Sequence, residues 1–299
     1  MLSKEERKYL WDYTQIFEPN KATNQVPPPA YYQEYAKNTT IETQWIDTVA
    51  GKNRIDLVQR DDRPKDSPVF VYFYGGAWGN PQGERHDWFC RRLASETNYL
   101  IVNCHYALSG VAGFPIPEYE GYDVCKWVSD NAQLLGIDPG KIIVGGGSSG
   151  GSLANAVAMI NVEKKGFEIA QLVLIYPVHR HDIIRADNLL LRLHNMLHCE
   201  SPEDENHPLA TPIHAPDEAF QGYPEVVYVT DTKDFLLEEE KELIQRFISL
   251  NIPVNFRIHE GIHGYLVRWL EEYDEAIIDM EAQMMARMSV IDIMRNRRK

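Results

Sequence analysis

The stretch Lys141-Ile-Ile-Val-Gly-Gly-Gly-Ser-Ser-Gly-Gly-Ser-Leu-Ala154 decides how the rest of the chain is interpreted. Its apolar start predicts a buried strand, and the Ala-rich run from Leu153 predicts a helix. A glycine-flanked serine between a strand and a helix is typical of a nucleophile elbow, where a sharp turn raises the serine hydroxyl above the sheet. The pattern G-x-S-x-G fits this stretch twice, centred on Ser148 or on Ser149.

Other interpretations of a glycine- and serine-rich run are less consistent with its surroundings. A flexible linker rarely separates a strand from a helix, and no lysine follows these glycines as a phosphate-binding P-loop requires. The dinucleotide-binding spacing G-x-G-x-x-G does fit residues 145–150. That function would place an acidic residue at the end of the next strand, where the chain has Ile175-Tyr176-Pro177.

Length and composition narrow the class of protein. The 299 residues, 44% of them hydrophobic, suit one large α/β domain or two small ones. A net charge of −14 disfavours nucleic acid as a partner. The N-terminus lacks the apolar segment of a signal peptide, and no apolar run is long enough to cross a membrane, so a cytoplasmic location is expected. Four widely spaced cysteines suit a reducing compartment: Cys90, Cys104, Cys125 and Cys199.

The order of predicted elements indicates a single α/β domain with a mostly parallel sheet and helices on both faces. Residues 1–40 form a Tyr- and Pro-rich N-terminal arm, and residues 178–222 interrupt the alternation of strands and helices, which predicts a cap over the carboxyl ends of the strands. Strands are predicted at 41–48, 54–59, 69–74, 100–104, 142–144, 170–175, 225–230 and 254–258. Helices are predicted at 85–96, 118–135, 153–162, 185–197, 238–250 and from about 267 to the C-terminus.

Polar residues follow the last two predicted strands: Asp234 comes after one and His263 after the other. A serine hydroxyl is a weak nucleophile that needs a base, and the base needs an acid to orient it. Serine, aspartate and histidine in this order are typical of the α/β-hydrolase fold. Asp231 and His259 are the rivals for the last two roles, and both are interpreted as strand-end residues.

Five segments resemble the hormone-sensitive-lipase-like branch of the α/β-hydrolases, in the same order, over about residues 55–290. That branch has H-G-G-G-W, D-Y-R-L-A-P…F-P, V-x-G-D-S-A-G-G-N-L-A, D-P-L and M-x-H-G-F segments. The matching stretches here are Tyr74-Gly-Gly-Ala-Trp78, His105-Tyr-Ala-Leu108 with Phe114-Pro115, Val144 to Ala154, Asp234-Phe-Leu236 and Gly261-Ile-His-Gly-Tyr265.

The resemblance implies a serine carboxylesterase that cleaves small esters through an acyl-enzyme, without a metal or organic cofactor. It places Ser148 as the nucleophile, His263 as the base and Asp234 as the orienting acid. The oxyanion would be held by backbone N–H groups of the glycine pair and of the residue after the nucleophile, namely Gly75, Gly76 and Ser149.

The chain departs from the family at two positions beside this site. Tyr74 replaces the histidine before the glycines, and Gly147 replaces the acid before the nucleophile. Both departures put the geometry of the oxyanion hole and the substrate range in question. Three aromatic residues in the matching segments are expected to be pocket walls or core residues: Trp78, Phe114 and Tyr265.

Several alternatives stay open at this point. The same triad would serve an amidase such as an aryl formamidase, and a member with a defective triad would be a ligand-binding module. His194 and His198 have the i, i+4 spacing of a zinc pair, but the cap histidines are interpreted as surface or pocket-lining groups. The apolar residues between 277 and 294 cover more than one face of the predicted helix. This predicts either core packing or, as favoured here, a homodimer contact. A modest cap favours short acyl chains.

Overall fold

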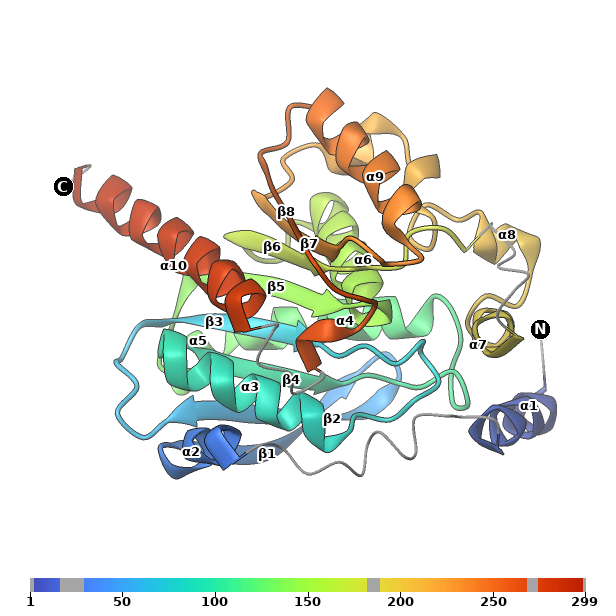
Figure 1. The fold of residues 1–299 in the computed structure, drawn as a ribbon, viewed down its shortest axis with the longest axis horizontal. Helices are drawn as coiled ribbons and strands as arrows, with labels where there is room; N and C mark the ends of the chain where they lie inside the picture. Colours follow the sequence, from blue (N-terminus) through green and yellow to red (C-terminus); the bar gives the residue numbers. More distant parts are fainter. Residues whose placement is uncertain (1–2, 17–29, 182–188, 268–273, 298–299) are drawn as a thin grey trace.

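The computed structural model describes residues 3–16, 30–181, 189–267 and 274–297. Within them one eight-stranded sheet has the order β1-β2-β4-β3-β5-β6-β7-β8 (Figure 1). The first two strands form a hairpin, β2 pairs antiparallel with β4, and the pairs from β4 through β8 are parallel. The strands are β1 (Thr39–Thr48), β2 (Gly51–Arg60), β3 (Ser67–Phe73), β4 (Leu100–His105), β5 (Ile137–Gly147), β6 (Gln171–Ile175), β7 (Val226–Asp231) and β8 (Val254–His259).

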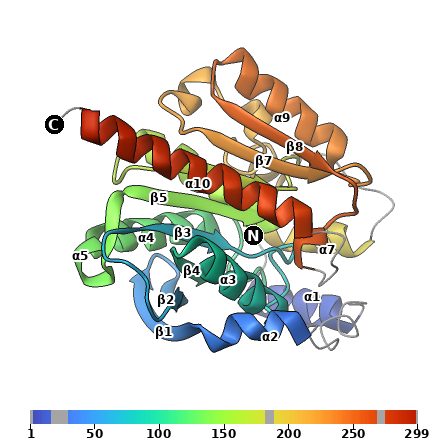
Figure 2. The same ribbon diagram turned by 60° about the vertical axis from the view of Figure 1, so that its left-hand side comes forward.

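Helices cover both faces of this sheet (Figures 1 and 2), which confirms the predicted α/β architecture. On one face lie α3 (Glu84–Thr97) and α10 (Asp274–Arg297), and on the other α4 (Ile116–Asp130) packs against α6 (Ser149–Lys164). The remaining helices are α1 (Lys4–Ile16), α2 (Ala30–Lys37), α5 (Ala132–Leu135), α7 (Leu189–His198), α8 (Pro202–Glu205), α9 (Leu237–Ser249) and the 3₁₀ turns η3 (Pro212–His214), η4 (Asp217–Phe220) and η5 (Tyr265–Val267).

The predicted helix over 118–135 is two helices rather than one. Asn131 leaves helical geometry, with φ −101° and ψ 19°, and its side-chain amide donates a hydrogen bond to the Trp127 carbonyl at 2.8 Å. An asparagine that bonds the preceding turn in this way competes with continuation of the helix. The start of the predicted helix over 185–197 and the residues 268–273 of the last predicted helix lie outside the described residues.

The core lies on both sides of the parallel strands. Residues Val69 to Phe73 and Val226 to Val229 are fully or almost fully buried, as a strand covered by helices on both faces requires. All four cysteines are free and buried, and burial raises the pKa of each thiol. No helix in the described ranges combines the length and apolar character needed to span a bilayer.

The N-terminal arm divides between two places. Helix α2 lies against α3, whereas α1 lies beside α7 at the opposite end of the molecule (Figure 1). The Arg7 guanidinium is buried there, where it donates to the carbonyl oxygens of Ser109 and Leu197 at 2.5 and 2.7 Å and pairs with Glu200. Trp11 Nε1 donates to the Gly79 carbonyl at 2.8 Å. Helices α1 and α7 thus form a two-helix layer, called the cap below.

Candidate active site

Ser148 occupies a strained turn between β5 and α6. Its φ of 54° and ψ of −123° are unfavourable for a residue with a Cβ, and such strain is found mainly at functional sites. The flanking glycines are sterically required, because a Cβ on Gly146 or on Gly150 would overlap the Phe73 carbonyl oxygen of β3. The turn therefore holds its serine at the carboxyl edge of the sheet, as the sequence predicts.

A chain of two hydrogen bonds leads from this serine into the protein. Ser148 Oγ lies 2.9 Å from His263 Nε2, and His263 Nδ1 lies 2.8 Å from Asp234 Oδ2. The Asp234 carboxylate is 0% exposed, whereas the His263 side chain is 23% exposed. The other carboxylate oxygen of Asp234 accepts the Leu236 N–H at 2.9 Å, which fixes its orientation. Such a chain can take a proton from the serine and stabilise the resulting imidazolium.

The rival acid and base lie in different surroundings. Asp231 Oδ1 accepts the Lys233 N–H at 3.1 Å, and burial together with the charge of Asp234 raises the pKa of Asp231 to about 6. His259 Nε2 instead lies 3.5 Å from Asp279 Oδ2 on α10. The structure therefore brings Ser148, Asp234 and His263 together and directs the two rivals to other partners.

A second buried carboxyl group lies behind the catalytic aspartate candidate. Glu240 of α9 is fully buried and accepts a hydrogen bond from the Thr230 hydroxyl. Burial raises the pKa of Glu240 to about 9, with the charge of Asp234 acting in the same direction. Glu240 is therefore a neutral acid at physiological pH. Nothing in the sequence singles out this group, because Glu240 is one of several glutamates in the predicted helix.

The loop after β3 lies against the elbow. A Cβ on Gly75 would come within 2.9 Å of the Gly147 carbonyl oxygen and 3.1 Å of Ser148 Cβ, so the backbone itself approaches the nucleophile candidate. Helix α6 begins at Ser149, so the Ser149 N–H has no acceptor within the helix. The Gly76 N–H, which was predicted to be an oxyanion donor, donates to Ser149 Oγ at 3.0 Å in this structure.

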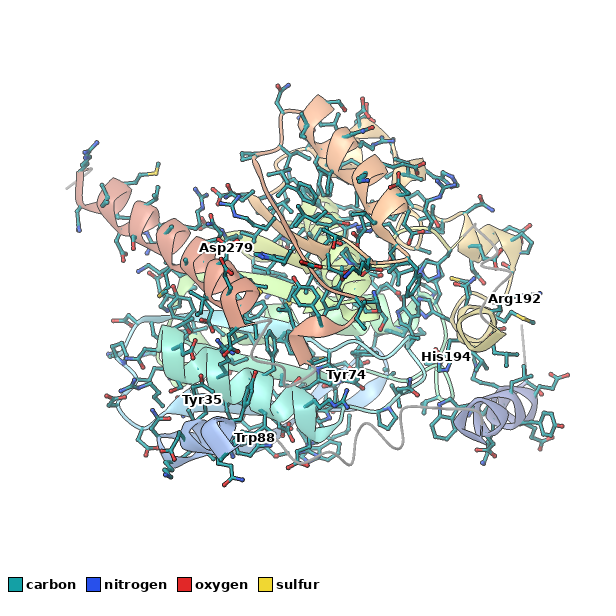
Figure 3. All side chains as sticks on the ribbon, in the orientation of Figure 1. Tyr35, Tyr74, Trp88, Arg192, His194 and Asp279 are labelled. Atoms are coloured by element: carbon teal, nitrogen blue, oxygen red, sulfur yellow. The ribbon has the colours of Figure 1, made fainter. Side chains whose placement is uncertain are left out.

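A histidine that the sequence did not single out supports this loop. His86 of α3 is hydrogen-bonded through Nδ1 to the Tyr72 hydroxyl at 3.0 Å, and its ring also bonds the Gly75 backbone. Burial lowers the pKa of His86 to about 3, so the ring stays neutral. It also packs 5.4 Å from the ring of Tyr74, which stands where the family has histidine. Tyr74, which Figure 3 labels, is 2% exposed.

Two of the three predicted aromatic residues lie in the core, and other aromatic rings lie next to His263. Trp78 is 3% exposed and stacks on His198, with ring centroids 4.3 Å apart, and Tyr265 is fully buried. Phe114 is half-buried between His198 and His207. The rings closest to His263 belong to Tyr176 and Phe235, at 5.1 and 4.8 Å. Their positions in the sequence, directly after β6 and directly after Asp234, could have identified them as neighbours of His263.

Tyr176 also gives a physical reason for Gly147. A Cβ at residue 147 would lie 3.3 Å from the Tyr176 ring, which is tighter than most Cβ contacts. The acidic side chain that the family carries at this position would have to displace that ring. Glycine at position 147 therefore leaves room for the Tyr176 ring beside His263.

Most histidines of the region predicted as a cap insertion are buried, so the surface alternative was wrong for them. Four of the six histidines between residues 178 and 222 are 1% exposed: His179, His181, His194 and His198. His194 Nδ1 bonds the Ala77 carbonyl at 2.9 Å, and Figure 3 shows His194 on α7, while His198 Nε2 lies 3.0 Å from Glu118 Oε1. In the part of the chain that the structure describes, no three His, Cys, Asp or Glu residues are placed to hold one metal ion.

Comparisons with known proteins agree with this arrangement. A family model described as the alpha/beta hydrolase fold matches residues 70–267. A putative alpha/beta hydrolase of Acanthamoeba polyphaga mimivirus is 27% identical over 242 residues, which are 77% of this chain and 70% of the relative. An arylesterase of Saccharolobus solfataricus is 26% identical over 66% of this chain and 68% of its own length.

A solved structure extends the likeness to nearly the whole chain. The esterase of Pyrobaculum calidifontis superposes with a TM-score of 0.76 at 26% identity, covering 96% of this chain and 93% of its own. The matched residues 70–267 include the elbow, the glycine loop, Asp234 and His263. With its mostly parallel sheet and its family match over these residues, the chain belongs to the α/β-hydrolases, in their hormone-sensitive-lipase-like carboxylesterase branch.

Proposed function

We propose that the protein is a serine carboxylesterase that cleaves small esters through an acyl-enzyme intermediate. The observation that carries the proposal is the hydrogen-bond chain from Ser148 through His263 to Asp234, starting on a strained elbow. Relatives described as an arylesterase and as a carboxylesterase support the same reaction class. No step of this reaction calls for a metal or an organic cofactor.

In the first half-reaction, Ser148 Oγ attacks the ester carbonyl carbon while its proton moves to His263 Nε2. The buried Asp234 carboxylate stabilises the imidazolium through Nδ1. Negative charge on the former carbonyl oxygen is held by the N–H groups of Gly75 and Ser149, at the positive end of α6. Collapse of this intermediate breaks the ester bond, and His263 returns the proton to the departing alcohol.

In the second half-reaction, water attacks the acyl group on Ser148. His263 takes the water proton, and the second tetrahedral intermediate collapses to release the carboxylic acid and restore the serine hydroxyl. An amide is the alternative substrate for the same triad, as in an aryl formamidase. A ligand-binding module without catalysis is disfavoured, because the three side chains are hydrogen-bonded in the order that catalysis requires.

We also infer short acyl chains as the preferred substrates, since α1 and α7 pack against the loop that follows the oxyanion glycines. Four buried thiols fit a reducing, cytoplasmic compartment. A homodimer through α10 is supported by its exposed apolar side chains, and light scattering would distinguish it from a monomer. The exposed set is Ile278, Met285, Val290, Ile293 and Met294.

The Ser148→Ala variant tests the reaction. We expect its kcat for p-nitrophenyl acetate to fall by about 10⁴-fold or more, because removing a triad nucleophile leaves only binding and oxyanion stabilisation. A fluorophosphonate probe should label the wild-type protein once per chain and the variant not at all. Full turnover by a correctly folded Ser148→Ala protein would refute the assignment, and absence of labelling of the wild type would favour a binding module.

A further inference from the structure

The loop after β3 contains two consecutive residues in the left-handed region of backbone geometry. Ala77 has a φ of 50° and Trp78 a φ of 58°. Glycine adopts such angles readily, whereas a residue with a Cβ adopts them only at a cost in free energy. The hormone-sensitive-lipase-like branch has glycine where this chain has Ala77. The loop is therefore strained, and contacts from other parts of the chain are needed to hold it.

Both cap helices bond this loop through carbonyl oxygens on either side of Trp78. His194 Nδ1 of α7 donates to the Ala77 carbonyl at 2.9 Å, and Trp11 Nε1 of α1 donates to the Gly79 carbonyl at 2.8 Å. Since a carbonyl oxygen can only accept, Nδ1 of His194 carries a proton. The His194 ring also lies so close to Gly79 that a Cβ there would overlap it.

The carbonyl between these two is held by a residue that the cap also binds. The N–H and the hydroxyl of Ser109 donate to the Trp78 carbonyl at 2.8 and 3.2 Å. Ser109 is fully buried, and its own carbonyl accepts a hydrogen bond from the Arg7 guanidinium of α1 at 2.5 Å. Three successive carbonyl oxygens of the loop are therefore bonded, and a cap helix takes part in holding each of them.

The predicted oxyanion glycines lie between this anchored segment and a second fixed point. On the side of β3, the Tyr106 hydroxyl donates to the Tyr74 carbonyl at 3.0 Å. The glycine pair, Gly75 and Gly76, follows directly and precedes Ala77. An oxyanion hole is effective because its donors are in place before the reaction starts. Whatever fixes the residues after the glycine pair therefore limits how far the pair can move.

We propose that Trp11 and His194 are positioning residues, through which the docked cap holds the strained glycine loop in the geometry that catalysis needs. This proposal rests on the proposed esterase function. Both side chains act through the loop backbone rather than on the reacting atoms. When the cap opens, the strained loop relaxes, so docking of α1 and α7 governs kcat as well as the size of the substrate.

The Trp11→Phe variant tests the bond from α1, because it removes the indole N–H and keeps an aromatic ring beside Gly110. We expect kcat for p-nitrophenyl acetate to fall about fivefold, as the loss of one hydrogen bond allows. KM should change less than about twofold, and p-nitrophenyl hexanoate should show the same loss of kcat. A loss confined to the longer ester would overturn the proposal, because the cap would then act only as a wall of the acyl pocket.

Two substitutions of His194 separate the bond from α7 from its packing. His194→Asn keeps an amide N–H near the position of Nδ1, so its kcat should stay within about twofold of the wild type. His194→Leu has no donor and should lose about fivefold in kcat. Equal losses in the two variants would overturn the role of the bond.

The Ala77→Gly background tests whether strain is the link between cap and loop. Glycine adopts a positive φ without the cost that alanine bears, so the loop should depend less on the cap. Trp11→Phe should then lower kcat only about twofold, measured as a double-mutant cycle. The same fivefold loss in both backgrounds would refute the proposal.

Trp88→Phe is the matched control, since its indole nitrogen donates to the Glu84 side chain within α3 at 3.3 Å. It should leave kcat unchanged, and a loss equal to that of Trp11→Phe would overturn the positioning role. Fluorophosphonate titration distinguishes the two possible failures. Full labelling of Trp11→Phe with an unchanged kcat refutes the positioning role alone, and an unlabelled wild type refutes the esterase.

Discussion

The elbow and the cap both lie at the carboxyl edge of the sheet, but they are held by different kinds of force. In the elbow, backbone segments of β3, β5 and α6 pass so closely that glycine is required at fixed positions. In the cap, α1 and α7 are held by long polar side chains, such as Arg7 and Trp11, that reach backbone carbonyls. The elbow contacts are between backbone atoms of neighbouring segments, such as Gly150 and Phe73. The cap contacts are made by side chains that reach carbonyl oxygens about 70 to 190 positions away.

The largest expected effect breaks the elbow. Gly150→Ala would place a methyl group against the Phe73 carbonyl oxygen, and neither backbone can move without disrupting the sheet. We expect a loss of more than about 4 kcal/mol of unfolding free energy, measured by urea denaturation, or no soluble protein. Gly147→Ala in the same run is the control, since its Cβ would meet only the edge of the Tyr176 ring at 3.3 Å. It should cost about 1 kcal/mol. Equal costs for the two variants would contradict the steric account.

An intermediate effect is expected in the cap. Arg7→Met removes the guanidinium that bonds Ser109, Leu197 and Glu200, and it leaves the Glu200 carboxylate, which is 11% exposed, without that partner. Breaking a buried ion pair costs about 3–5 kcal/mol. We expect this loss to release α1 from the cap while the rest of the protein stays folded. Limited proteolysis should cut the first 30 residues at least about tenfold faster. Lys8→Met, which removes an exposed i, i+4 pair with Asp12, should not change that rate. Cooperative unfolding of the whole chain in Arg7→Met would show that the cap is not separable.

The smallest expected effect concerns the pH dependence of stability near Asp234. The pKa of Glu240 is about 9 in the folded protein against an ordinary 4.5, so the native state keeps a proton that the unfolded chain releases. Stability from this group is fully present below pH 4.5 and is lost as the pH rises through 9. Glu240→Gln keeps an acceptor for Thr230 and stays neutral. Between pH 5 and 9 its melting temperature should therefore fall less than that of the wild type, with a difference of about 5 °C.

Glu238→Gln serves as the matched control for that measurement, because Glu238 is an exposed residue of the same helix that pairs with Lys241. Its melting curve should follow the wild type across the pH range. If the melting temperature of Glu240→Gln depended on pH as that of the wild type does, Glu240 would be ionised and solvated in the folded protein.

The same contrast explains what could be predicted from the sequence. The elbow, the parallel sheet and the order of Ser148, Asp234 and His263 follow from local patterns of glycine, apolar runs and strand ends. The partner of the Gly76 N–H, Ser149 Oγ, could not be predicted, because the two residues lie 73 positions apart in the sequence. The burial of His194 and His198 likewise depends on Ala77 and Glu118, far away in the sequence. The break at Asn131 was missed because its side chain competes with the helix only once the preceding turn exists.

The buried cysteines make it possible to measure separately how fast the cap and the sheet open. Cys104 lies in β4 at the centre of the sheet, while Cys199 follows α7 directly and its sulfur lies 3.6 Å from His181 Nδ1. Thiol alkylation needs an exposed thiolate, so each cysteine reacts only when its own surroundings open. Under native conditions, alkylation of Cys199 therefore reports opening of the cap, and alkylation of Cys104 reports unfolding of the sheet. The rates at which Cys199 and Cys104 are alkylated therefore measure the opening of the two regions separately, without an added label.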